Sequence, residues 1–169
     1  MDSDIASYEE WHAAMATVDR VSFLIAPTLP ACTPRRYDFP IYDVYSPLYL
    51  CFTSGGPIAP VLALNVSKRL GYVEATFTYH LMLREARDLG AWFAGPPLSA
   101  MASFSPNIEA MATTIGNALA KIDLSAAIAG GSIERILAGE SRHKVPSPNL
   151  NLAVCAVYLG RDREAQSLL

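Results

Sequence analysis

Residues 72–79 read Tyr-Val-Glu-Ala-Thr-Phe-Thr-Tyr, and their alternation decides the fold class of this chain. The apolar residues that are expected inside occupy every second position: Val73, Ala75, Phe77 and Tyr79. A period of two is typical of a strand in an antiparallel sheet with one buried and one solvated face. We therefore predict a half-buried strand over 72–79 as the reference strand of a β-meander.

The segments that precede this strand in the sequence also favour extended structure. Short runs of aromatic and β-branched residues are bounded by glycine- and proline-containing turns, as in strands joined by tight connections. The expected strands are residues 21–26, 42–45, 48–53, 58–66 and 72–79, with a proline-rich loop over 27–40. This pattern predicts an antiparallel β-meander of about four to five strands.

Helical periodicity dominates both ends of the chain. Residues 3–18 repeat apolar side chains every three or four positions, and Ser3 or Asp4 is placed to cap that helix. The helices expected in the second half are 80–94, 105–122 with Ser105 as its cap, 124–138 broken at the Gly130–Gly131 pair, 150–159 and 161–169. Residues 1–169 therefore predict one α+β domain: an N-terminal helix, the meander and a helical C-terminal half.

The last residues carry one local resemblance. Residues 156–160, Ala-Val-Tyr-Leu-Gly, are followed by Glu164-Ala165 and Leu168-Leu169, which resembles the helical hairpin of a tetratricopeptide repeat. No second copy follows at that family's period, and such solenoids need about three repeats. We therefore expect an ordinary helix pair and transfer no function. The ending on two leucines without a polar tail is also consistent with truncation at the C-terminus.

Composition excludes several classes of protein. The chain has 169 residues, is 51% hydrophobic and carries a net charge of −3, which excludes a wholly disordered protein. Nucleic-acid binders concentrate basic residues, whereas no such concentration occurs here. Residues 1–20 are acidic and lack an apolar export core, and the uncharged stretch 44–67 is interrupted by prolines and glycines. We expect a cytoplasmic protein that binds neither nucleic acid nor membrane.

The three cysteines form no recognisable framework. Their number is odd and none has the C-x-x-C spacing, which argues against disulfide scaffolds and zinc knuckles. Cys51 and Cys155 lie in apolar runs and are expected to be buried. Cys32 lies close to Arg35 and Arg36, whose charges would lower a thiol pKa, so it is the one candidate for reactivity.

Catalytic and cofactor-binding motifs are absent from the sequence. It contains no G-x-x-x-x-G-K-[ST], G-x-G-x-x-G, H-E-x-x-H or G-x-S-x-G. The Glu9-x-x-His12 pair has the spacing of di-iron bundles but lacks the second pair that such a site needs. We expect no metal and no cofactor, and the chain leans away from being an enzyme.

The leading hypothesis rests on the missing catalytic motifs and export signal, on the mild acidity, and on an unusual concentration of tyrosine and arginine. The candidate binding residues are Arg35, Arg36, Tyr37, Tyr42, Tyr45 and Tyr49. Tyr and Arg are enriched at the energetic centres of protein interfaces. We interpret the chain as a non-catalytic protein-binding module of bacterial type, immunity-like or chaperone-like, with a protein partner. This hypothesis predicts that residues 37–49 form a contiguous exposed patch.

Two alternatives remain open. Glu74 and His80 could serve a small hydrolase-like or ligand-binding enzyme with a pocket on the sheet face. They are six residues apart on an extended chain, roughly 20 Å, so another strand would have to supply a partner. The other alternative is a homo-oligomeric structural protein, which predicts exposed apolar surface on residues 150–169.

Overall fold

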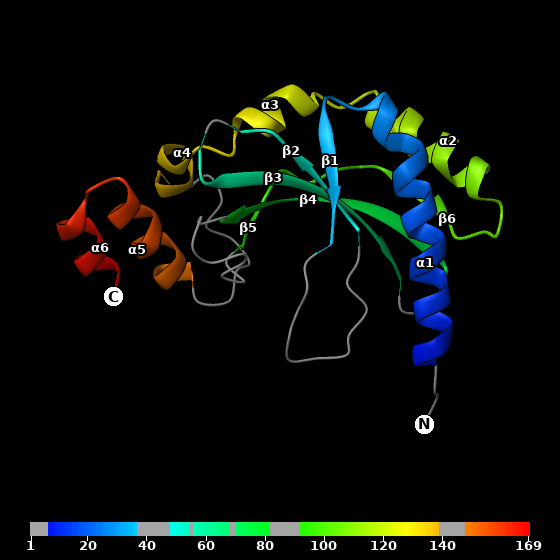
Figure 1. The fold of residues 1–169 in the computed structure, drawn as a ribbon, viewed down its shortest axis with the longest axis horizontal. Helices are drawn as coiled ribbons and strands as arrows, with labels where there is room; N and C mark the ends of the chain where they lie inside the picture. The colour runs from blue at the N-terminus through cyan, green and yellow to red at the C-terminus, as the bar shows by residue number, and fades with distance from the viewer. Residues whose placement is uncertain (1–6, 37–47, 55, 68–69, 82–91, 139–147) are drawn as a thin grey trace.

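The centre of the fold is an antiparallel sheet built around β3 (Ile58–Val66) and β4 (Tyr72–Leu81) (Figure 1). The computed structural model describes residues 7–36, 48–54, 56–67, 70–81, 92–138 and 148–169. The remaining strands of the sheet are β1 (Cys32–Arg35), β2 (Tyr49–Phe52), β5 (Trp92–Ala94) and β6 (Met101–Ser103). They run in the order β1-β2-β3-β4-β5, and β6 also pairs with β4. The described residues thus confirm the predicted α+β class.

The predicted strand at 72–79 is confirmed and extends to Leu81 as β4. Its four alternating apolar residues are buried, whereas the side chains between them are half-buried or exposed. The nine-residue register with β3 runs from Ile58 opposite Leu81 to Val66 opposite Val73. The predicted strands 48–53 and 58–66 are confirmed as β2 and β3. The predicted strand 42–45 lies outside the described residues.

Strands β5 and β6 share one edge of β4 and are separated along it. Strand β6 pairs with residues 72–74, and β5 pairs with residues 78–80. The chain leaves the ladder at Gly95, whose backbone N–H donates to the Phe77 carbonyl at 3.0 Å. A Cβ atom at Gly95 would lie 2.5 Å from the same carbonyl oxygen, so the close approach requires glycine at this position.

Two helices, α1 (Tyr8–Ile25) and α2 (Ile108–Leu119), pack against each other beside the sheet (Figure 1). Ser7 caps α1 through a reciprocal capping box with Glu10, so this helix begins later than the sequence predicts. Asn107, rather than the expected Ser105, caps α2. The buried side chains of α2 are Met111, Ile115 and Leu119, which are spaced by four residues along one face of the helix.

The predicted strand over 21–26 is wrong, because α1 continues through Ile25. Val18, Val21 and Ile25 are spaced by three and four residues and are all buried. This helical face continues the stripe that begins at Met15, so packing against the sheet and α2 extends the helix through β-branched residues. Short apolar runs cannot be assigned to strand or helix by periodicity alone.

Two further expectations are corrected. The predicted helix 80–94 is wrong at both described ends, because residues 80–81 belong to β4 and residues 92–94 form β5. Residues 82–91 lie outside the described residues. The expected loop 27–40 includes the short 3-10 helix η1 (Ala26–Thr28) and the edge strand β1.

The C-terminal helices follow the sequence prediction closely. They are α3 (Leu124–Ala129), α4 (Ile133–Leu137), α5 (Pro148–Tyr158) and α6 (Asp162–Leu168). Asp123 caps α3, and the Gly130–Gly131 pair separates α3 from α4. Gly160 has a φ of +71° between α5 and α6, a conformation that favours glycine.

The Gly130–Gly131 pair also places α3 directly on the sheet. The Tyr79 hydroxyl donates to the Ala127 carbonyl at 2.7 Å, and a Cβ atom at Gly130 would collide with that hydroxyl. A Cβ atom at Gly131 would lie 3.0 Å from Pro60 Cγ. The two glycines therefore permit a close contact as well as a break between helices.

Candidate functional site

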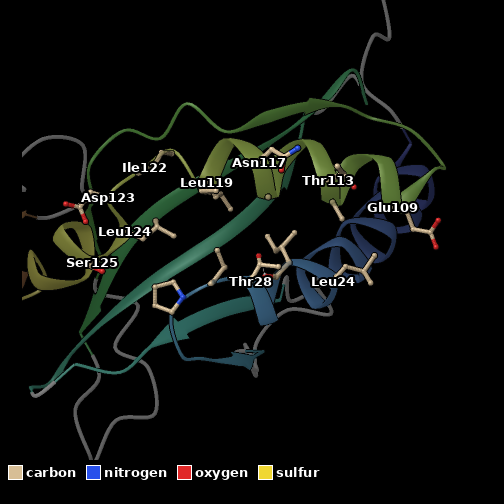
Figure 2. A pocket seen from close by; sticks show the side chains of 16 residues that line it. Leu24, Thr28, Glu109, Thr113, Asn117, Leu119, Ile122, Asp123, Leu124 and Ser125 are labelled. Carbon is tan, nitrogen blue, oxygen red and sulfur yellow. Dashed lines mark hydrogen bonds between the residues drawn. The ribbon is translucent and has the colours of Figure 1, made fainter.

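A groove lies between the C-terminal half of α1 and α2 and extends to the start of α3 (Figure 2). Its volume is about 640 Å³. Figure 2 shows Leu24 and Thr28 on the α1 side and Thr113 and Asn117 on the α2 side. The groove thus combines apolar surface with hydroxyl and amide groups, a composition that suits recognition of a largely apolar ligand.

A second cavity of about 590 Å³ adjoins this groove at the N-terminal end of α2. The two cavities share Leu24 and Glu109 in their linings, and we call the two together the α1–α2 groove. Arg20, Phe23 and Leu24 line the second cavity, and they lie on one face of α1 because they are spaced by three and four residues. Phe23 is 54% exposed and Leu24 is 49% exposed.

Two polar side chains that line the groove form hydrogen bonds with the backbone of the same chain. Thr28 Oγ1 donates to the Ile25 carbonyl at 2.7 Å, and Asp123 Oδ1 accepts from the Ala126 backbone N–H at 3.0 Å. Glu109 is exposed in the first turn of α2. The groove therefore has an apolar base, formed in part by the buried Leu119, and acidic groups at its rim.

Sequence reasoning missed this groove because it assigned residues 21–26 to a strand. With α1 continued to Ile25, helical spacing separates the buried Val18, Val21 and Ile25 from the exposed Phe23 and Leu24. Extending the 3.6-residue period of residues 3–18 by two turns would have revealed this outward face. The contribution of α2, more than 80 residues later, required the structure.

The predicted Tyr/Arg surface is described only in part. Arg35 and Arg36 are exposed at the end of β1, and Tyr49 is half-buried on β2. Tyr37, Tyr42 and Tyr45 lie outside the described residues. The contiguous exposed patch over residues 37–49 therefore stays a prediction.

A buried carboxylate connects this region to α1. Asp19 is 4% exposed, and its Oδ2 atom lies 2.5 Å from Arg36 Nη2. Its Oδ1 atom accepts from the Leu48 backbone N–H at 3.2 Å. Asp19 thus holds the chain at residue 36 and again at residue 48, and it anchors β1 and the start of β2 to α1.

The alternative enzyme residues do not meet. Glu74 and His80 lie at opposite ends of β4, where Glu74 pairs with Asn65 of β3. His80 Nε2 is 3.0 Å from Thr78 Oγ1, and the His80 ring centroid lies 5.5 Å from that of Tyr49. The structure therefore joins one residue of each predicted site, Tyr49 and His80, on the sheet face.

Three cavities lie among the described residues considered for an enzyme site, and neither Glu74 nor His80 lines any of them. The two cavities of the α1–α2 groove contain neither Glu74 nor His80. A third cavity, of about 540 Å³ between the β2–β3 turn and α3–α4, contains neither residue as well. None of these three described cavities supports the enzyme alternative, which stays a prediction.

The expected reactivity of Cys32 is not supported by its surroundings in the structure. Cys32 is half-buried in β1, and burial, with a smaller contribution from Cys51, raises the pKa of its thiol. The predicted lowering by Arg35 and Arg36 is therefore wrong, because desolvation disfavours the thiolate. Burial also raises the pKa of Cys155 to about 11. Cys51 and Cys155 are buried as predicted.

Because the pKa of Cys155 is raised, the free energy of unfolding should decrease as the pH rises in the alkaline range. The unfolded thiol ionises near its ordinary value of 9.0, whereas the folded thiol stays protonated. The free energy of unfolding should therefore be unaffected by this thiol below about pH 9 and fall by at most about 1.4 kcal/mol per unit up to about pH 11. Urea unfolding at several pH values would measure this. Cys155→Ala should show a shallower decrease, and an identical decrease in both proteins would contradict the assignment.

Within the described residues, no helix is long and apolar enough to cross a membrane. The same part of the chain has no group of three or more His, Cys, Asp or Glu residues that could hold a metal ion. Comparison with protein-family models, curated proteins and solved structures finds no match for this chain.

Proposed function

We propose that this chain is a non-catalytic protein-binding module that holds an apolar segment of its partner in the α1–α2 groove. The observation that carries the proposal is the pair Phe23 and Leu24, two large apolar side chains about half exposed beside a cavity. Single exposed apolar residues are ordinary, whereas adjacent ones at the edge of a groove are typical of contact surfaces.

The composition of the groove favours a short amphipathic helix as the bound segment. Helix α2 has twelve residues, so the groove beside it runs for about 18 Å, or about three helical turns. A helix of that length places apolar side chains on one face at spacings of three and four residues. Arg20 and Phe23 add residue types that are enriched in protein interfaces.

The Tyr/Arg residues extend this proposal toward β1. Arg36 contacts α1 at Asp19, one helical turn before Phe23. A partner seated at Phe23 would therefore approach Arg36, and Tyr37, Tyr42 and Tyr45 are its predicted further contacts. An immunity-like or chaperone-like role in a bacterial cytoplasm is the finer form of this proposal and rests on the sequence alone.

Leu24→Lys is expected to abolish retention of the partner in affinity capture from lysate of the source cells. Lysine replaces the apolar surface that Leu24 offers to the bound segment with a hydrated charge, so binding to the purified partner should weaken about thirtyfold or more, as for interface centres. Phe23→Ala should weaken binding in the same assay. Isothermal titration calorimetry with the captured and purified partner measures both effects.

The matched control is Met101→Lys. Met101 is 50% exposed, nearly the same as Leu24, but it lies on β6 outside the groove. The wild type and this control should retain the same protein with the same affinity. Equal retention by all variants, or no specific retention by the wild type, would contradict the proposed function.

A further inference from the structure

The third cavity, of about 540 Å³, lies where the β2–β3 turn meets three helices. Its walls come from that turn, the end of α3, the start of α4 and the end of α5. None of its described lining residues also lines the α1–α2 groove, so the two are separate. Small-molecule sites have volumes of roughly 300–1,000 Å³. This cavity is therefore large enough for a ligand of its own.

The only charge in the described lining of this cavity is negative. Glu134 lies in the first turn of α4 and is exposed. Within the described residues its carboxylate forms no ion pair. No lysine, arginine or histidine belongs to that lining. A charged ligand in this cavity is therefore a cation, because an anion would meet a carboxylate that no basic group in the lining neutralises.

Two helix ends add to the negative character of the cavity. Helix α5, with eleven residues, ends at Tyr158, and α3 ends at Ala129, and both residues line the cavity. The C-terminus of a helix carries partial negative charge, which favours a nearby cation. Helix α4 begins at the same cavity, but it has only five residues, and its N-terminus is already met by the Ser132 cap and by Glu134. The helix ends thus favour the same sign of ligand as the carboxylate.

The remaining lining residues indicate what carries the positive charge. Tyr158 is 57% exposed at the cavity, so its ring is available for contact. Aromatic rings attract organic cations through their negative faces. The apolar lining can contact a hydrocarbon body, and it includes Pro57, Ile128, Ile133 and Leu159. The lining therefore suits an ammonium group on an apolar body better than a hydrated metal ion.

We propose that this cavity binds a small organic cation, in which an ammonium group is carried on a hydrocarbon body. Glu134 supplies the opposite charge, and Tyr158 supplies the aromatic contact. Figure 1 shows α4 and α5 at the end of the sheet opposite α1 and α2. The site therefore does not depend on the function proposed for the α1–α2 groove.

Three probes test the class of ligand: cyclohexylammonium, cyclohexanol and cyclohexanecarboxylate share one ring and differ in charge. NMR titration of the isotope-labelled protein at neutral pH should show cyclohexylammonium shifting the amide resonances of residues 131–134 and 158–159. For so small a ligand we expect a dissociation constant of about 1 mM. Cyclohexanol should bind about tenfold more weakly, because it lacks the charge. Absence of these shifts with cyclohexylammonium, or an equal or higher affinity for either of the other two probes, overturns the proposal.

Two substitutions test the contacts. Glu134→Gln keeps the shape of the side chain and removes its charge, so cyclohexylammonium should bind about fivefold more weakly. Tyr158→Leu should weaken binding about threefold. The matched control is Glu9→Gln, which removes the same charge from an exposed position in the first turn of α1, outside the cavity. This control should bind as the wild type does, and circular dichroism checks that each variant is folded. Equal affinities of Glu134→Gln and Glu9→Gln overturn the assignment of the site.

Discussion

Tyr79→Ala is expected to lower the free energy of unfolding by about 4 kcal/mol, as for other buried aromatic side chains truncated to alanine. Tyr79 is 3% exposed, packs against Phe77 and donates its hydroxyl to the Ala127 carbonyl at 2.7 Å. The alanine variant loses the ring and leaves a cavity between β4 and α3. Tyr79→Phe keeps the ring, so it should cost only about 1 kcal/mol. Urea unfolding followed by circular dichroism measures both values.

A second substitution tests whether Tyr79 explains the glycine at position 130. Gly130→Ala should destabilise the wild type by about 1–3 kcal/mol, because the added methyl group collides with the Tyr79 hydroxyl. In the Tyr79→Ala background the same change should be nearly neutral. A double-mutant cycle would then give a coupling energy of about 1 kcal/mol or more. Additive effects would show that Gly130 is required for another reason.

Asp19→Ala is expected to destabilise the fold by about 2–3 kcal/mol, because a buried backbone donor loses its acceptor. Leu48 is 4% exposed, and its N–H donates to Asp19 Oδ1. The substitution also removes the contact with Arg36. Chemical denaturation measures the loss.

Asp19→Asn separates the two contributions of this carboxylate. Asparagine keeps an oxygen that can accept from Leu48 but removes the charge that pairs with Arg36. We expect it to cost about 1 kcal/mol, since the Arg36 side chain is 43% exposed and its ion pair is screened by water. If alanine and asparagine destabilise equally, the acceptor role of Asp19 at Leu48 is wrong.

The parts of the fold that could be predicted are those whose structure is determined by residues close together in the sequence. In β4, alternate residues meet core and solvent, so the period of two is visible in the sequence. Asp123 and Gly160 lie at the ends of helices, and the capping chemistry of each is a property of the residue itself. These signals depend on neighbours within a few residues.

The errors come from contacts between distant segments. Residues 21–25 read as a strand because of their β-branched and aromatic content, whereas their packing beside β3 and α2 makes them helical. Trp92 to Ala94 were assigned to a helix but form a three-residue edge strand that pairs with β4. The α1–α2 groove could not be predicted for the same reason, since its two walls are far apart in the sequence.

The broken edge beside β4 has a consequence for the behaviour of the protein at high concentration. Unpaired edge strands invite pairing with other chains, and this is a route to aggregation. At this edge Pro96 and Pro97 fall between β5 and β6, and at the opposite edge Pro34 lies within β1. Proline has no backbone N–H to offer an added strand. These prolines therefore disfavour the addition of a strand from another chain at their positions along the described sheet edges.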